Sequence, residues 1–317
     1  MPIDTSGFVA DALALGALPL DSPQAREYLA GVQCVYTDLD GTIFARGGVL
    51  LANAAGKSCG TGAMAFASVQ AAGIEVVVDT GRSAKVSGEI MRMLNVHTFI
   101  GEMGAEIRRS WLSDDACEYY LGDWDFQPSH EGETPLDAII ASGVTDALIG
   151  TWPEQLVWHV PYSNSRRVVA LLCGYIDDLE KAQALADSFP IPLLVLDNGV
   201  TASRNIVLET CPEMCSYHIV PKGVSKGVAL EADLKIKGLD PDVVLAIGDA
   251  PADAYMGDYA GAVVIPGTAA ANPQMRLAIQ DLAGRGRRVF VGTQPGCDIW
   301  PEMARILLEV KGEEVRF

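Results

Sequence analysis

Short apolar runs alternate along the chain with stretches of helical pattern. The runs at residues 32–37, 74–78 and 243–247 are too short for helices and are rich in β-branched side chains, so each predicts a buried strand. The stretches at 54–72 and 83–94 have the composition of helices. Strands that alternate with helices are typical of a doubly wound, mostly parallel α/β sheet, so we expect a Rossmann-like core.

Two further segments near the start have readable patterns. Residues before Gly31 have a helical pattern, and Ser22-Pro23 predicts a helix start because a capping side chain precedes proline. Residues 43–51 surround Gly47-Gly48 and predict a small hairpin after the first strand.

The regular alternation is interrupted in the middle of the chain. Short strands and helices mix there without a fixed order, and the first pattern returns afterwards. A chain of 317 residues is long enough for a core and one inserted module. We therefore expect an N-terminal helical extension at 1–30, a discontinuous core at 31–108 and 218–317, and an inserted α+β domain at 109–217.

Composition and charge narrow the choice of partners. Apolar residues make up 49% of the chain, enough for a sizeable core, and the net charge of −18 repels nucleic-acid phosphates and anionic lipids. We expect a small-molecule ligand, no nucleic acid and no membrane, and the oligomeric state stays open. Seven scattered cysteines favour reduced thiols, and the start has no basic leader, so we expect a cytoplasmic protein.

The first predicted strand ends in two carboxylates. Asp38 and Asp40 lie two residues apart, just before Gly41, which permits a sharp turn. Phosphoryl transfer needs a nucleophile, cations around the phosphoryl oxygens and an acid for the leaving group. A carboxylate bound to a hard cation such as Mg²⁺ stays ionised and can attack, while its neighbour holds a proton. A plain Asp-rich turn is the alternative interpretation.

Three later segments offer complementary groups. Thr80-Gly81-Arg82 follows the second strand and presents a hydroxyl and a backbone N–H to a phosphate, or merely caps a helix. Lys226 opens a helix and can supply a point cation, although most lysines are solvated. Asp249 and Asp253 follow the strand at 243–247. They can bind a metal ion together, or they can be the acidic residues that are common in the first turn of a helix.

Taken together, these segments resemble the four motifs of the haloacid dehalogenase superfamily. Asp38-Leu39-Asp40-Gly41-Thr42 is similar to the first motif, Thr80-Gly81-Arg82 to the second, Lys226 to the third, and Gly248-Asp249 with Asp253 to the fourth. The long insert resembles the subgroup with a large α+β cap, which includes the Cof-type, sucrose-phosphate and mannosyl-3-phosphoglycerate phosphatases. Residues 248–256 are most similar to the last of these.

The resemblance implies a magnesium-dependent phosphatase that acts on a small phosphate monoester, such as a sugar phosphate, through an aspartyl-phosphate. It implies that Asp38 is the nucleophile and that Asp40 is the general acid and then the base. It also implies that Thr80, the Gly81 N–H and Lys226 hold the phosphate.

A magnesium site is part of the same resemblance. The implied Mg²⁺ ligands, with the last acting directly or through water, are Asp38, the Asp40 carbonyl, Asp249 and Asp253. Two positions depart from the subgroup, because Ala252 and Met103 stand where Asn is usual or frequent. Both departures remove a polar side chain near the expected site, which weakens the inference about substrate.

Other interpretations stay open on the sequence. Phosphomannomutases share these motifs and a similar cap, so phosphoryl transfer between sugar hydroxyls is a second hypothesis. A non-catalytic phosphate-binding or metal-binding protein is a third, although it has no need of Asp40. Within the insert, Arg166-Arg167 can face a substrate anion or form an ordinary solvated pair, and Cys211, Cys215 and His218 can bind Zn²⁺ only with a fourth ligand.

Overall fold

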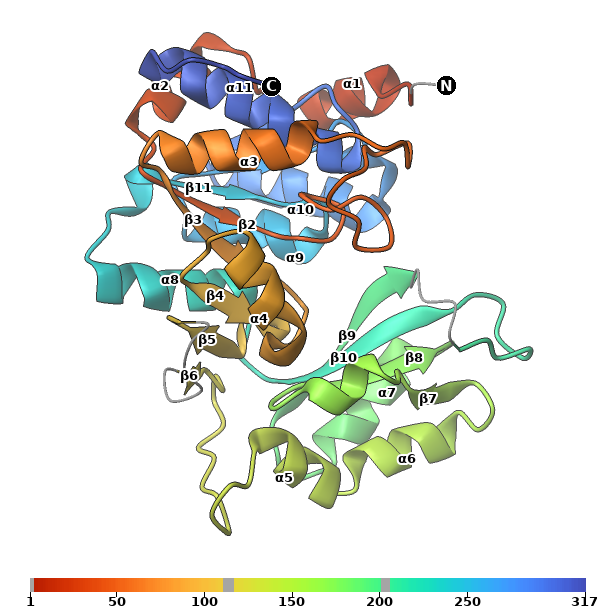
Figure 1. Ribbon diagram of the computed structural model, residues 1–317. Helices are drawn as coiled ribbons and strands as arrows, with labels where there is room; N and C mark the ends of the chain where they lie inside the picture. The colour runs from red at the N-terminus through yellow and green to blue at the C-terminus, as the bar shows by residue number, and fades with distance from the viewer. Residues whose placement is uncertain (1–2, 111–116, 201–205) are drawn as a thin grey trace. The chain divides into compact units, whose positions relative to one another are not determined.

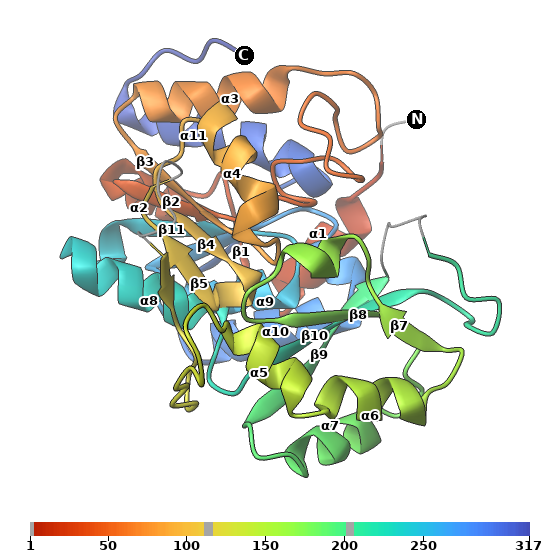
Figure 2. The same cartoon turned by 60° about the horizontal axis from the view of Figure 1, so that its bottom comes forward.

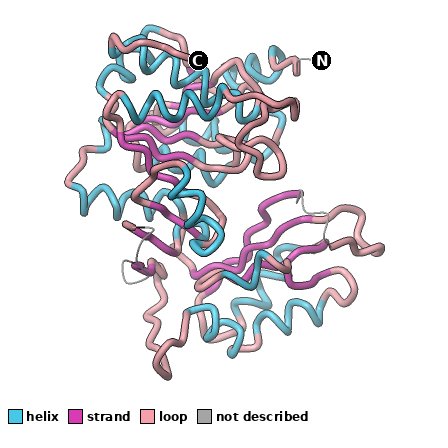
Figure 3. Tube along the Cα trace, viewed as in Figure 1, coloured by secondary structure: helices cyan, strands magenta, loops and turns pink. Residues whose placement is uncertain are grey.

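The computed structural model describes residues 3–110, 117–200 and 206–317 (Figure 1). The chain divides into two compact units, one made of residues 1–80, 94–99 and 226–317 and the other of residues 81–93 and 100–225. Each unit contains both strands and helices (Figure 3). The parts of the predicted insert at 111–116 and 201–205 lie outside the described residues.

A nine-stranded, mostly parallel sheet has the strand order β1-β13-β12-β11-β2-β3-β4-β5-β6. The bounds of its strands are β1 (Leu18–Pro19), β2 (Cys34–Thr37), β3 (Glu75–Asp79), β4 (Phe99–Gly101), β5 (Glu106–Arg108), β6 (Cys117–Tyr119), β11 (Val244–Ile247), β12 (Ala262–Ile265) and β13 (Val289–Val291). Neighbouring strands from β1 across to β3 run parallel, whereas β5 and β6 are antiparallel. The predicted doubly wound, mostly parallel α/β architecture is confirmed.

Helices cover both faces of the strands in the first unit, with α3 and α11 on one face and α8 and α9 on the other (Figure 1). The helix bounds are α1 (Ser6–Ala14), α2 (Pro23–Gly31), α3 (Thr61–Ala71), α8 (Lys226–Lys237), α9 (Pro251–Ala254), α10 (Pro273–Gly284) and α11 (Ile299–Lys311). Strand β2 contacts both layers, since the Thr37 hydroxyl accepts a hydrogen bond from Trp300 of α11 at 2.8 Å and the Tyr36 hydroxyl donates one to Asp233 of α8 at 2.6 Å. Coverage on both sides explains why the central strands are continuous apolar runs.

The N-terminal segment is largely helical, as its pattern predicts. Ser22 caps α2, because its Oγ accepts a hydrogen bond from the Ala25 N–H at 3.2 Å, and Pro23 occupies the first turn. Strand β1 was not predicted, since two residues are too few to show a period. Within the described ranges, no helix combines the length and the apolar character needed to cross a membrane.

Two predictions near the first strand were wrong in extent. The helix expected at 54–72 begins only at Thr61. The residues before it form a turn in which Asn53 Oδ1 accepts a hydrogen bond from the Lys57 N–H and Gly56 adopts a φ of 74°. The hairpin expected at 43–51 is reduced to one antiparallel bridge, between Ala45 and Val49.

The second unit is built on a four-stranded antiparallel sheet with the order β7-β8-β10-β9. Its strands and the helices of this unit are β7 (Leu156–Trp158), β8 (Ala170–Gly174), β9 (Leu193–Val200), β10 (Cys215–Pro221), α4 (Ala84–Met93), α5 (Pro135–Ala141), α6 (Val144–Thr151) and α7 (Leu179–Asp187). Helices α5, α6 and α7 lie on one face of this sheet (Figure 2), and their apolar residues share a core with Leu172 and Tyr217. Because side chains alternate along a strand, Ser216 and His218 of β10 point to the opposite face.

Candidate active site

The predicted site residues gather where parallel strands end. Strands β11, β2 and β3 are adjacent and parallel, so their carboxyl ends lie at one edge of the sheet. Asp38 directly follows β2, Thr80 follows β3, and Gly248-Asp249 follows β11. Open α/β sheets bind their ligands at this edge.

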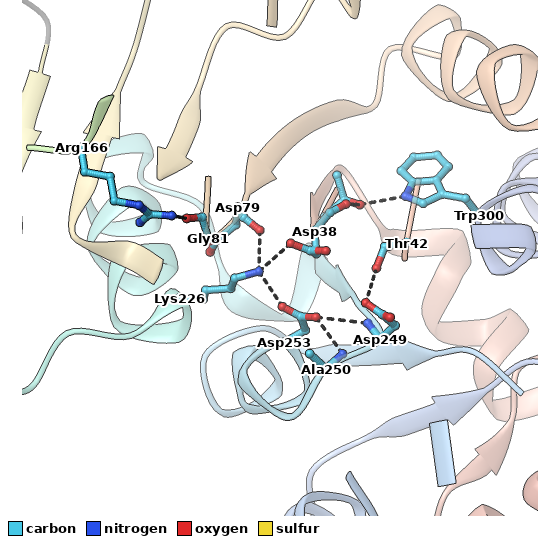
Figure 4. A network of polar contacts seen from close by, with 11 residues as sticks. Asp38, Thr42, Asp79, Gly81, Arg166, Lys226, Asp249, Ala250, Asp253 and Trp300 are labelled. Carbon is cyan, nitrogen blue, oxygen red and sulfur yellow. Dashed lines mark hydrogen bonds and ion pairs between the residues drawn. The ribbon is translucent and has the colours of Figure 1, made fainter. Parts of the chain in front are cut away.

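Lys226 is the first residue of α8, and its side chain is 4% exposed. Its Nζ donates hydrogen bonds to Asp38 Oδ1 at 2.7 Å, to Asp253 Oδ1 at 2.6 Å and to the Asp79 carbonyl oxygen at 3.0 Å (Figure 4). Burial by itself lowers the pKa of Lys226, but the carboxylates of Asp253 and Asp38 outweigh it and raise the pKa above its usual value. The buried ammonium therefore stays charged and links β2, β3 and the turn after β11.

Asp253 organises the turn that follows β11. Its Oδ2 accepts hydrogen bonds from the N–H groups of Asp249 at 3.1 Å and Ala250 at 2.9 Å, while its Oδ1 accepts from Lys226. A Cβ at position 248 would overlap the Asp253 carboxylate, so Gly248 leaves the space that this arrangement needs. The fourth motif is thus a compact turn whose backbone N–H groups bond the carboxylate of Asp253, a residue of the same motif.

Three carboxylates converge beside this turn. Asp38, Asp249 and Asp253 each offer an oxygen, and these atoms lie within 4.8 Å of one another; no other such group of His, Cys, Asp or Glu occurs among the described residues. Burial raises the pKa of Asp249 well above its usual value; the charges of Asp253 and Asp38 add to the rise, and the Lys226 charge opposes it. An all-oxygen donor set fits a hard divalent cation such as Mg²⁺. Both Asp253 oxygens already accept hydrogen bonds, which makes Asp38 and Asp249 the better direct ligands.

Asp38 is buried between charges of both signs. Burial raises the pKa of Asp38 to about 7; Lys226 opposes the rise, whereas Asp253 and Asp40 add to it. A cation at the carboxylate cluster favours the ionised form of Asp38, which is the form that can act as a nucleophile. Asp40, two residues on, is exposed to water.

Gly41 lies between the first motif and the carboxylate cluster. It has a φ of +87°, and a Cβ built on it would overlap the Asp249 carboxylate. Thr42 Oγ1 donates a long hydrogen bond of 3.4 Å to Asp249 Oδ1. Glycine is therefore needed at position 41 both for the backbone conformation and for the space.

The structure brings most of the predicted site residues to one edge of the first unit. Hydrogen bonds join Asp38 and Asp253 through Lys226, and Thr80 is buried at the end of β3. Gly81 belongs to the second unit, so its contribution to a phosphate site stays a prediction. The catalytic, phosphate-binding and metal-binding roles of all these residues likewise stay predictions.

Sequence reasoning missed Asp79, the last residue of β3. It is fully buried, and neither of its carboxylate oxygens has a hydrogen-bond partner among the described residues. Burial raises the pKa of Asp79 well above its usual value; the Lys226 charge opposes the rise, and the Asp253 and Asp38 charges increase it. A signal was available, because an acid at the end of an otherwise apolar strand, directly before Thr80, has no ordinary packing role.

Two open questions about the insert are answered. Arg166 is not an ordinary solvated residue, because its Nη2 donates to the Gly81 carbonyl at 2.8 Å and its Nε and Nη1 atoms are buried. Cys211, Cys215 and His218 do not form a group of converging metal ligands within the part of the chain that the structure describes. The zinc interpretation is therefore dropped.

Comparisons with known proteins agree with this fold and these motifs. A solved structure from Thermoplasma acidophilum is similar with a TM-score of 0.57 at 16% identity, over 88% of this chain and 99% of that one. The family model of the haloacid dehalogenase-like hydrolases matches residues 205–274, which include the third and fourth motif segments. The resemblance seen in the motifs is thereby confirmed, as is the prediction of an enzyme of the phosphatase type.

Two further proteins are similar to this chain over most of their length. The sucrose-phosphatase of Synechocystis sp. PCC6803, solved with sucrose and phosphate, matches with a TM-score of 0.55 at 16% identity, over 87% of this chain and 98% of that one. The phosphoglycolate phosphatase of Methanoculleus marisnigri is 25% identical over 232 residues, which are 73% of this chain and 82% of that protein. These likenesses extend through both units of the chain.

Proposed function

We propose that this protein is a Mg²⁺-dependent phosphatase of the haloacid dehalogenase type that releases phosphate from a small phosphate monoester, such as a sugar phosphate. The observation that carries the proposal is the Lys226 ammonium held between Asp38 and Asp253 at the strand ends, with Asp249 beside them. On a chain of net charge −18, this ammonium and a carboxylate cluster suited to a divalent cation provide the local positive charge that a phosphate requires.

The chain's own residues account for the two halves of the reaction. An Asp38 carboxylate oxygen attacks phosphorus, the bond to the leaving oxygen breaks, and Asp40 gives that oxygen its proton. Asp40 then takes a proton from a water whose oxygen attacks the aspartyl-phosphate, which releases inorganic phosphate and restores the Asp38 carboxylate. Lys226 stays protonated throughout and faces the negative phosphoryl oxygens. Mg²⁺, when bound, supplies the additional positive charge that these oxygens require.

Relatives support a small substrate. The similar proteins named phosphoglycolate phosphatase and sucrose-phosphatase are named for small phosphorylated compounds. The fourth motif adds a likeness to mannosyl-3-phosphoglycerate phosphatases. We include residues 109–217 in the proposal as the cap that selects the ester, because side chains outside the shared motifs set specificity in a common fold.

The test is phosphate release from a panel of sugar, glycerate, glycolate, nucleotide and cofactor monophosphates, with Mg²⁺ and with excess chelator. We expect selective release that requires Mg²⁺. Asp38→Asn removes the nucleophile and should lower this release by a factor of about 10⁴ or more.

The matched control is Glu27→Gln, which removes one negative charge from the exposed face of α2. It should leave phosphate release unchanged. Substantial Mg²⁺-dependent release by Asp38→Asn would contradict the mechanism. Conversion of a sugar 1-phosphate to a 6-phosphate without net release would instead identify a phosphomutase.

A further inference from the structure

Three chain segments of the second unit meet at Gly81, the residue directly after Thr80. They are Gly81-Arg82, the 3₁₀ turn at Glu102–Gly104 and the residues 166–169 that lead into β8. Polar contacts join each of these segments to the others, and the two central side chains are Glu102 and Arg166.

Arg166 holds the carbonyl of Gly81. Its Nη2 donates to the Gly81 oxygen at 2.8 Å (Figure 4), and its Nε and Nη1 atoms are buried. A guanidinium is planar and always charged, so one such bond fixes the direction of the acceptor more firmly than a neutral donor does. Burial of a guanidinium is costly, so a contact made in this way needs support from its surroundings.

Glu102 supplies that support through its side chain and its backbone. Its carboxylate is fully buried and accepts hydrogen bonds from the N–H groups of Arg167 at 2.8 Å, Val168 at 3.0 Å and Val169 at 2.8 Å. Its own N–H donates to the Arg82 carbonyl at 3.0 Å. Glu102 therefore joins the segment that carries Arg166 to the segment that follows Thr80.

The backbone around Glu102 is strained, so the contacts of this residue must maintain a conformation that is unfavourable by itself. Glu102 and Met103 have φ values of 51° and 64°, in the left-handed region that non-glycine residues rarely occupy. Such conformations are energetically unfavourable and cluster at functional sites. A Cβ on residue 81 would lie 3.0 Å from Met103 Sδ, so Met103 packs over Gly81 and restricts it further.

We propose that Glu102 and Arg166 form a clamp that positions the Gly81 backbone and so restricts the direction of the Gly81 N–H. The inference rests on the proposed function, in which the Gly81 N–H binds a phosphate oxygen. Glycine has more backbone freedom than any other residue, so the direction of its N–H depends on outside contacts. The clamp fixes the Gly81–Arg82 peptide through the Gly81 carbonyl, so that the Gly81 N–H can change direction only by rotation about the Gly81 φ and ψ bonds. Glu102 and Arg166 are therefore positioning residues.

The first test compares Arg166→Met with Arg92→Met, which removes the same charge from an exposed arginine of α4 in the same unit. Arg166→Met should raise KM and the inhibition constant of inorganic phosphate about tenfold, with kcat nearly unchanged, because the Gly81 N–H binds phosphate equally before and during the reaction. Arg92→Met should leave all three constants unchanged.

Further variants separate positioning from folding. Arg166→Lys keeps a cation that can reach the carbonyl and should recover part of the phosphate affinity that Arg166→Met loses. If Arg166 served only to stabilise the fold, the loss of phosphate affinity in each variant would instead parallel its loss of melting temperature. Glu102→Gln has one acceptor oxygen where the carboxylate has two, and it should act in the same direction as Arg166→Met. The double variant should be no worse than the more affected single one, since both side chains serve one clamp.

The outcomes distinguish this inference from the proposed function. If the wild-type protein neither turns over a monophosphate nor binds inorganic phosphate, the proposed function fails and the clamp fails with it. If the wild-type protein works and Arg166→Met has the same KM and phosphate inhibition as Arg92→Met, only the clamp is overturned. Additive losses in the double variant would also overturn it.

Discussion

At the scale of single residues, charge balance governs the candidate active site. Five carboxylates surround the ends of β2, β3 and β11 in the first unit, and Lys226 is the ammonium that bonds two of them. Asp79 differs from the others because neither of its oxygens has a hydrogen-bond partner among the described residues. Burial of an unpaired carboxylate is unfavourable, and burial raises the pKa of Asp79 well above its usual value, which favours its protonated form.

Asp79→Asn should therefore be more stable than wild type, by a margin that grows as the pH rises. Because burial raises the pKa of Asp79 in the folded protein, its carboxyl keeps a proton that the unfolded chain has already lost, and stability falls with rising pH above the unfolded pKa. Asparagine does not titrate, so the variant loses this dependence. In urea unfolding, the free energy of unfolding of Asp79→Asn relative to wild type should be larger at pH 8 than at pH 5. For Glu27→Gln this difference from wild type should be the same at both pH values. An equal difference at both pH values would mean that Asp79 is ionised when folded.

Gly41→Ala should prevent Mg²⁺ binding. The added Cβ would overlap the Asp249 carboxylate and force it away from Asp38. Gly47→Ala is the matched control, because Gly47 has a nearly equal φ of +86° with open space around it. Both variants carry the strain of a positive φ, roughly 1 kcal/mol, but only Gly41→Ala should lose Mg²⁺ affinity in calorimetric titration. Equal affinities in the two variants would remove Asp249 from the metal site.

At the scale of elements, helix α8 connects the site to the sheet through polar side chains as well as through packing. Its first residue, Lys226, bonds the site carboxylates, and two turns later the fully buried Asp233 accepts hydrogen bonds from Tyr36 at 2.6 Å and from Lys237 at 2.9 Å. Tyr36 lies on β2, two residues before Asp38. Asp233 therefore gives α8 a second polar contact with β2, in addition to that of Lys226 with Asp38.

Asp233→Ala should be strongly destabilising. It leaves the buried Tyr36 hydroxyl without its acceptor, while Lys237 keeps its ion pair with Glu75, and the loss of a buried hydrogen bond to a charged group costs about 1.5–3 kcal/mol. Glu231→Ala on the same helix removes an acid whose side chain is 43% exposed and should change stability by less than about 0.5 kcal/mol. Denaturant unfolding of both variants checks the difference. A similar small cost for both would show that α8 is held by apolar contacts alone.

At the scale of the whole molecule, a net charge of −18 makes cations a general source of stability. Specific binding must therefore be separated from screening, which acts at any site. The converging oxygens of Asp38, Asp249 and Asp253 predict that Mg²⁺ binds the folded chain and not the unfolded one.

Mg²⁺ should thus raise the melting temperature more than NaCl of the same ionic strength does. At a hundredfold excess over Kd the stabilisation is about 2.7 kcal/mol. In Asp249→Asn, Mg²⁺ should raise the melting temperature no more than NaCl does, because the variant lacks a ligand of the ion. The rise caused by NaCl should remain, because most of the surface charge is still in place. The same Mg²⁺ shift in Asp249→Asn and wild type, measured by calorimetry, would assign the effect to screening.

Much of the core could be predicted because its signals are local. The apolar runs at 32–37, 74–78 and 243–247 became β2, β3 and β11, since a strand covered on both faces has to be apolar throughout. The start of α3 and the two-residue β1 could not be predicted, because both depend on distant segments: Ala54, in the turn before α3, donates a hydrogen bond to Asp298, and β1 pairs with β13.

The sequence by itself determined the family resemblance and the candidate chemical groups, because motif residues are recognisable by type and spacing. The candidates that it indicated in this way are Asp38, Asp40, Lys226, Asp249 and Asp253. Only the tertiary structure revealed that Asp79 is buried without a partner and that Arg166 bonds Gly81, residues separated by 85 positions in the chain. The physical reason is that burial and pairing arise from packing between distant segments, which periodicity and spacing do not record.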